Sequence, residues 1–126
     1  MTAASFNFIN FHSFAGAIAR LEQMVGMAGF PMTENSIRSQ IASAIRIVVQ
    51  LHRFADGKRR VTSVSEVVGL DGGAIVMQEI FKLVRIKPGM QDALFQATGV
   101  RPSFLEMLEL NGATFPEDTF RPGAAL

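Results

Sequence analysis

The sequence lacks cysteine altogether and has only two histidines, His12 and His52, which stand far apart. Without cysteine the chain can form neither a disulfide framework nor a thiolate metal site, and two distant histidines do not suggest a structural metal. Long apolar runs are also missing, since none approaches the roughly 20 residues that a transmembrane helix needs. We therefore expect no bound metal and no membrane span.

An excess of charge of one sign is absent too. The 12 basic and 11 acidic residues give a net charge of +1, which creates no overall field that would recruit nucleic acid or an anionic membrane. The first nineteen residues contain no lysine or arginine, so the charged start of a signal peptide is missing. These absences predict a cytoplasmic protein with no nucleic-acid partner.

The residues that are present suffice for one hydrophobic core. The chain has 126 residues, of which 48% are hydrophobic. Apolar residues recur at three- and four-residue spacing between Phe14 and Ala28, which predicts a first helix. Thr33 is the expected N-cap of a second helix, with Glu34 in its first turn. Four methionines fall at core-like positions and are expected to pack inside: Met24, Met27, Met77 and Met107.

Strand patterns follow the helices. The β-branched run 47–54, the Asp56-Gly57 turn and the run 61–68 predict a hairpin with a basic tip. Residues 74–83 predict a third antiparallel strand and residues 93–98 a short fourth one. A final helix begins near Pro102, and the residues from 113 to 126 are predicted as a tail. The predicted fold is α/β or α+β: two helices, an antiparallel meander and a final helix in a single partial domain spanning 1–126.

Three segments carry a family resemblance: ARLEQMVGMAG at 19–29, IASAIRIVVQLHRFADGKRRVTSVSEVVG at 41–69 and ATGVRPSFLEMLELNG at 97–112. In this order and spacing they resemble the C-terminal part of CpaF-type pilus-assembly ATPases of the type II/IV secretion superfamily, over residues 9–120. The resemblance implies the C-terminal part of a RecA-like ATPase domain in a hexameric ring, which uses ATP and magnesium. It also implies a peripheral position at the inner face of the bacterial cytoplasmic membrane, near inner-membrane secretion proteins.

The phosphate-binding loop of such ATPases, G-x-x-x-x-G-K-[ST], does not occur in this sequence. The one Gly-Lys pair is Gly57-Lys58, and Arg59 follows it where the loop needs a hydroxyl. The acidic residues form no recognisable metal-binding motif. We therefore expect no catalytic, cofactor-binding or metal residue in this chain, and no ATP hydrolysis by the chain alone.

The resemblance selects a few residues for further attention. It marks Arg20, Glu22, Arg59 and Arg60 as candidates for subunit contacts or family motifs. Arg20 and Glu22, two apart on a helix, should each need a separate partner. For the basic tip, a solvated turn that keeps a strand edge unpaired is the simpler interpretation.

The family's histidine motif, H-A-N-S, precedes the helix that contains Arg20. In this chain the corresponding stretch includes Asn10, His12 and Ser13, and only Ser13 matches. We interpret it as a weak remnant of the motif, with a displaced role for His12 as the alternative.

Three functions remain open from the sequence. The first is a C-terminal fragment or shortened relative of a secretion ATPase, whose partners are other subunits or copies of itself. The second is a free-standing interaction module that docks on an ATPase ring and modulates it. The third is a non-functional gene remnant.

We predict that the purified chain does not bind ATP with magnesium, because the loop that would hold the phosphates is missing. Calorimetric titration or thermal shift should give no saturable signal. A full-length CpaF-type ATPase is the positive control. Saturable binding by this chain would contradict the prediction.

Overall fold

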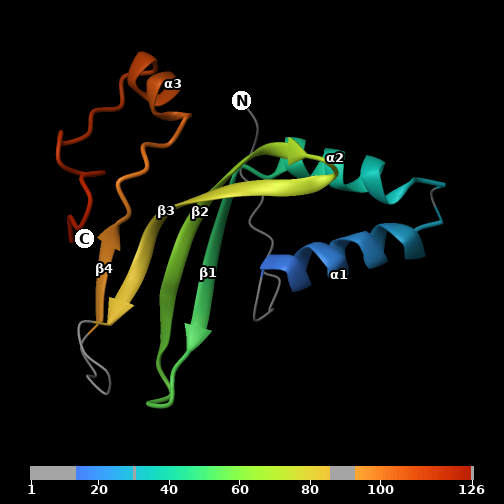
Figure 1. Cartoon of the computed structure of the whole chain (residues 1–126), viewed down its shortest axis with the longest axis horizontal. Helices are drawn as coiled ribbons and strands as arrows, with labels where there is room; N and C mark the ends of the chain where they lie inside the picture. The colour runs from blue at the N-terminus through green and yellow to red at the C-terminus, as the bar shows by residue number, and fades with distance from the viewer. Residues whose placement is uncertain (1–13, 30, 86–92, 126) are drawn as a thin grey trace.

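The computed structural model describes residues 14–29, 31–85 and 93–125. Within them lie three helices and one four-stranded antiparallel sheet, in the chain order α1, α2, β1, β2, β3, β4, α3 (Figure 1). The predicted succession of two helices, an antiparallel meander and a final helix is confirmed. The fold is of the mixed α and β type.

The two N-terminal helices form where the apolar spacing predicted them. α1 spans Phe14–Met27 and α2 spans Glu34–Ala44. The Thr33 hydroxyl accepts a hydrogen bond from the Ser36 N–H at 3.2 Å, so Thr33 caps α2 as predicted. The chain leaves α1 through Gly29, whose φ of 77° is a left-handed conformation that favours glycine.

Each strand of the sheet pairs with the next strand along the chain, so the order in the sheet is β1-β2-β3-β4. The predicted hairpins are confirmed. Gly72 and Gly73, with φ of 56° and 82°, give the second hairpin a turn that matches the twist of antiparallel strands. The strands are β1 (Ile47–Arg53), β2 (Arg59–Asp71), β3 (Ala74–Arg85) and β4 (Ala93–Ala97).

The core draws on every element except β1 within the described residues. Ile80 of β3 is its most completely buried large side chain, at 1% exposure. The other buried hydrophobic residues are Ile18, Ile37, Val67, Ala97 and Leu105.

The methionine prediction is wrong at three of its four positions. Met24, Met27 and Met107 are 51%, 77% and 48% exposed, whereas Met77 is half-buried. The reason in α1 is that this helix lies against α2 and away from the sheet, so only part of its apolar face is covered (Figure 1).

Residues 113–125, predicted as a tail, fold back along the sheet. They follow α3 (Leu105–Leu110) and run beside β4 at their end. The Gly123 N–H donates to the Ala97 carbonyl and the Ala97 N–H donates to the Ala124 carbonyl, both at 2.9 Å. This segment therefore covers the end of the outer edge of β4.

Gly99 allows Pro122 of the C-terminal segment to lie close to the backbone after β4. Its φ is 98°, and a Cβ on it would lie 2.6 Å from Cγ of Pro122. We predict that Gly99→Ala lowers the free energy of unfolding by about 2–4 kcal/mol, because a steric clash adds to backbone strain. Chemical denaturation followed by circular dichroism measures the loss.

The matched control is Gly112→Ala. Gly112 has a similar φ of 92°, but nothing lies within 4 Å of the place that a Cβ would take there. It should therefore lose only the strain, about 1–2 kcal/mol. Equal losses in the two variants would show that Pro122 does not crowd position 99.

Candidate functional site

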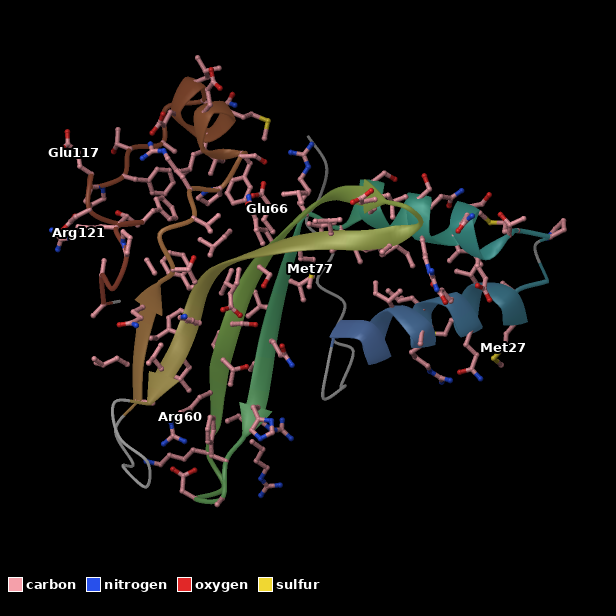
Figure 2. The ribbon with its side chains drawn as sticks, viewed as in Figure 1. Met27, Arg60, Glu66, Met77, Glu117 and Arg121 are labelled. Carbon is pink, nitrogen blue, oxygen red and sulfur yellow. The ribbon has the colours of Figure 1, made fainter. Side chains whose placement is uncertain are left out.

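Glu66 is a charged side chain held inside the fold. It lies on β2 and is only 3% exposed. Its carboxylate accepts hydrogen bonds from the Ser103 N–H at 3.1 and 3.2 Å, from the Ser103 hydroxyl, and from Nε2 of Gln78 at 2.9 Å. Figure 2 shows Glu66 where the sheet meets the C-terminal segment. We call Glu66, Gln78 and Ser103 the Glu66 clamp, because they tie β2 and β3 to the residues before α3.

The electrostatics of the clamp favour the ionised carboxylate. Burial by itself would raise the pKa of Glu66, but hydrogen bonds from Ser103 and Gln78, with the nearby charge of Arg46, hold that pKa below its ordinary value of 4.5. The carboxylate oxygens are already bound to donors of the fold. We therefore interpret Glu66 as a structural link.

A second link joins the two helices. Arg38 of α2 forms an ion pair with Glu22 of α1, with 2.6 Å between Nε and Oε1, and its Nη1 donates to the Gly73 carbonyl at 3.3 Å. The hydrogen bond to Glu22 raises the pKa of Arg38. Sequence reasoning missed Arg38, although a glutamate in need of a distant partner was the signal.

Arg20 and Glu22 have separate partners, as their spacing predicted. Glu22 binds Arg38, whereas Nη1 of Arg20 donates to Oε1 of Gln23 at 2.9 Å. Glu22 is therefore engaged within the fold, and Arg20 remains on the exposed face of α1.

The basic tip comprises residues 53–60 of the β1–β2 hairpin. Arg60 is held by Asp56, with 2.7 Å from Nη2 to Oδ2 and 3.2 Å from Nη1 to Oδ1. Its guanidinium also lies 5.0 Å from the centre of the Phe54 ring. The hydrogen bond from Arg60, with one from the Lys58 N–H, lowers the pKa of Asp56 to about 2. Arg60 is thus engaged within the tip.

Arg59 has a different environment from Arg60. In the register of β1 with β2, Arg59 lies directly opposite Arg53. Like charges at opposed positions repel. Both side chains are exposed, and neither forms an ion pair within the described residues. Of these two candidate residues, Arg60 is bound by Asp56, whereas Arg59 forms no ion pair within the described residues.

The β1 edge is open in the part of the chain that the structure describes. β1 pairs with β2 on one side only. Ile47, Val49 and Leu51 alternate along it, so they share one face, and they are 38%, 48% and 47% exposed. An open edge with exposed apolar side chains is suited to the addition of another strand.

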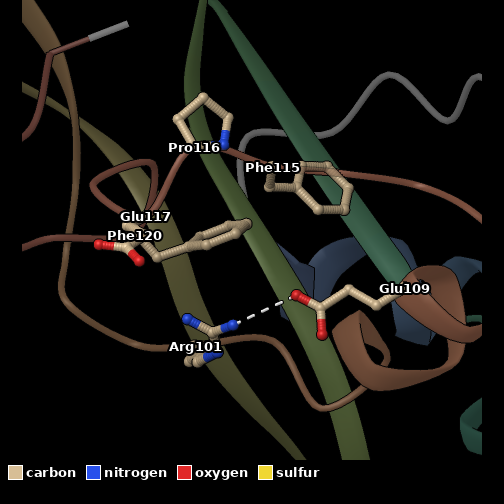
Figure 3. A pocket seen from close by; sticks show the side chains of 6 residues that line it. All are labelled: Arg101, Glu109, Phe115, Pro116, Glu117 and Phe120. Carbon is tan, nitrogen blue, oxygen red and sulfur yellow. Dashed lines mark hydrogen bonds and ion pairs between the residues drawn. The ribbon is translucent and has the colours of Figure 1, made fainter.

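A hollow of about 390 Å³ lies beside α3 (Figure 3). Nη2 of Arg101 pairs with Oε1 of Glu109 at 3.5 Å across one side of it. The rings of Phe115 and Phe120 have centres 6.2 Å apart. The hollow thus combines aromatic rings with carboxylates; its lining residues are Arg101, Glu109, Phe115, Pro116, Glu117 and Phe120.

No protein-family model matches the chain, and no curated protein matches it either. Among the described residues, no group of three or more His, Asp or Glu side chains is placed to hold a metal ion. No helix of the described ranges is long and apolar enough to cross a membrane. Asn10, His12 and Ser13 lie outside the described residues. The candidate surfaces are the basic tip, the β1 edge and the hollow.

We predict that Glu66→Ala lowers the free energy of unfolding by about 2–4 kcal/mol, because it removes the buried carboxylate that accepts hydrogen bonds from Ser103 and Gln78 and leaves a cavity. Glu79→Ala, which removes an exposed glutamate of β3, should cost less than about 0.5 kcal/mol. Urea unfolding measures both. Similar losses for the two variants would contradict the role of the clamp.

The contribution of the clamp should also depend on pH. The folded pKa of Glu66 lies below the ordinary value of 4.5, so the stability it adds is complete above pH 4.5 and is lost as the pH falls through the folded pKa. The difference in unfolding free energy between the wild type and Glu66→Gln should therefore shrink on acidification below pH 4.5. A difference that stays constant there would show that ionisation of Glu66 contributes nothing.

Proposed function

We propose that the chain is the C-terminal part, or a shortened relative, of a type II/IV secretion or pilus-assembly ATPase of the CpaF type. It acts by joining other subunits and does not hydrolyse ATP alone. In this proposal the described fold is the C-terminal part of a RecA-like domain, and other chain segments supply the nucleotide site. The assembly is a ring at the inner face of the cytoplasmic membrane.

The open β1 edge is the observation that carries the proposal. Every other described helix and strand contributes a buried hydrophobic side chain to the core, and β1 contributes none. Its apolar residues Val49 and Leu51 instead stay about half exposed, on a strand that pairs on one side only among the described residues. A strand in this position is suited to continue into a larger sheet, as the family resemblance requires.

The resemblance segments are also connected in space. Glu66 of segment 41–69 binds Ser103 of segment 97–112, so two of the three segments meet at the clamp. Such a contact gives a physical reason for the two segments to occur together. It supports treating them as one functional unit.

The candidate residues take different roles under this proposal. Glu22 and Arg60 hold the fold through Arg38 and Asp56. Arg20 and Arg59 are exposed and are the residues that we assign to contacts with other subunits.

We predict that the chain binds a purified full-length CpaF-type ATPase and that Val49→Lys with Leu51→Lys weakens this binding at least about tenfold. Charged side chains on an edge strand oppose the addition of a strand. Biolayer interferometry with the immobilised ATPase measures the affinity. Thermal unfolding confirms that the variant is folded, which its half-exposed positions allow.

The control variant is Met27→Lys with Leu110→Lys. These residues are 77% and 82% exposed and lie on α1 and α3, away from β1. Binding should be unchanged in this variant. Absence of binding by the wild-type chain, or equal loss in both double variants, would reject the proposal.

A further inference from the structure

The basic tip carries positive charge that the fold does not neutralise. Asp56 is the only acidic residue of the tip, and Arg60 binds it. Arg53 and Arg59 lie opposite each other, and Lys58 is exposed next to them. The repulsion between two like charges at opposed positions decreases when a carboxylate binds to them.

The hollow beside α3 offers the complementary chemistry. The cation of Arg101 is neutralised there by Glu109. Glu117 is exposed and forms no ion pair within the described residues, and Phe115 is 40% exposed. A guanidinium within about 6 Å of an aromatic ring is attracted to its face, and a carboxylate adds a charge-assisted hydrogen bond.

The chain already uses this combination once. In the basic tip, the guanidinium of Arg60 lies over the Phe54 ring at 5.0 Å while Asp56 binds its nitrogens. In the hollow, aromatic rings and the Glu117 carboxylate line the same cavity, and the one cation among its lining residues, Arg101, is paired with Glu109. The hollow therefore offers the same kinds of group that bind Arg60 in the basic tip.

A single chain cannot bring the basic tip and the hollow together. The tip lies at one end of the sheet and the C-terminal segment at the other, as the labelled Arg60 and Glu117 show (Figure 2). Roughly 23 Å of extended β2 separates Arg59 from Glu66, where the C-terminal segment is attached. Any contact between the basic tip and the hollow must therefore join two copies of the chain.

We propose that the basic tip of one copy docks in the hollow of a second copy, where Arg59 lies against Phe115 and Phe120 and binds Glu117. The two surfaces differ, so the contact is head-to-tail, and repetition of it produces a closed ring or an open filament. The proposal deepens the proposed function by naming the contact between subunits, and its ring form rests on that function. Its test uses this chain alone, so it can fail independently of binding to an ATPase.

The first experiment is sedimentation equilibrium of the wild-type chain over a series of concentrations and salt levels. We expect self-association that weakens as salt increases, because exposed charges are screened. Arg59→Glu and Glu117→Lys should each weaken the association at least about tenfold. The controls are Lys82→Glu on β3 and Glu106→Lys on α3, which change exposed charges outside the tip and the hollow and should leave the association unchanged.

The second experiment combines changes at the tip and in the hollow. Mixing Arg59→Ala with Glu117→Ala leaves one intact tip and one intact hollow and creates no inverted charge pair, so the mixture should form a one-to-one complex that does not grow further. Placing Arg59→Glu and Glu117→Lys in one chain inverts both charges and should restore self-association. Circular dichroism of each variant confirms that loss of association is not loss of folding.

Three results would overturn the proposal. The first is a wild-type chain that stays monomeric at every concentration. The second is equal weakening by Glu117→Lys and Glu106→Lys. The third is binding of inorganic phosphate or single-stranded DNA that depends on Arg59 while self-association does not.

Discussion

The buried carboxylate of Glu66 determines how the C-terminal segment sits on the sheet. An isolated charge at 3% exposure would cost several kcal/mol, and the donors from Ser103 and Gln78 offset that cost. Because one donor is a backbone N–H, the clamp fixes the path of the chain into α3 as well as a side chain. The hollow is lined by Glu109 of α3 and by residues after α3, so this contact helps to place its walls.

The same attachment makes the two edges of the sheet unlike each other. With the chain held at Ser103, residues 113–125 return along β4 and bond to Ala97. No comparable segment of the described chain reaches β1, whose face with Val49 and Leu51 stays exposed. The fold thus directs any added strand to one edge, which removes the ambiguity that two open edges would create.

Local chemistry explains which features the sequence predicted well. The Asp56-Gly57 and Gly72-Gly73 turns and the Thr33 cap act over a few residues, so the hairpins and α2 could be predicted. Glu66 and Ser103 are 37 positions apart, and no spacing rule connects them. The exposed methionines and the docked C-terminal segment were missed for the same reason, since both depend on how elements pack. The basic tip could be predicted from the sequence. That Arg60 binds Asp56 while Arg59 lies opposite Arg53 could be seen only from the strand register.

That register also makes the charge at the tip unavoidable. The Asp56-Gly57 turn sets the pairing of the hairpin, and the pairing places Arg53 opposite Arg59 whatever the rest of the chain does. Asp56 can neutralise one cation, and its geometry commits it to Arg60. The like charges of Arg53 and Arg59 therefore stay side by side in the separate chain, where solvent and salt screen them, and a bound carboxylate would reduce their repulsion further. Relief of this repulsion adds to the free energy of association, so a tip that is unfavourable alone is for that reason better suited to bind.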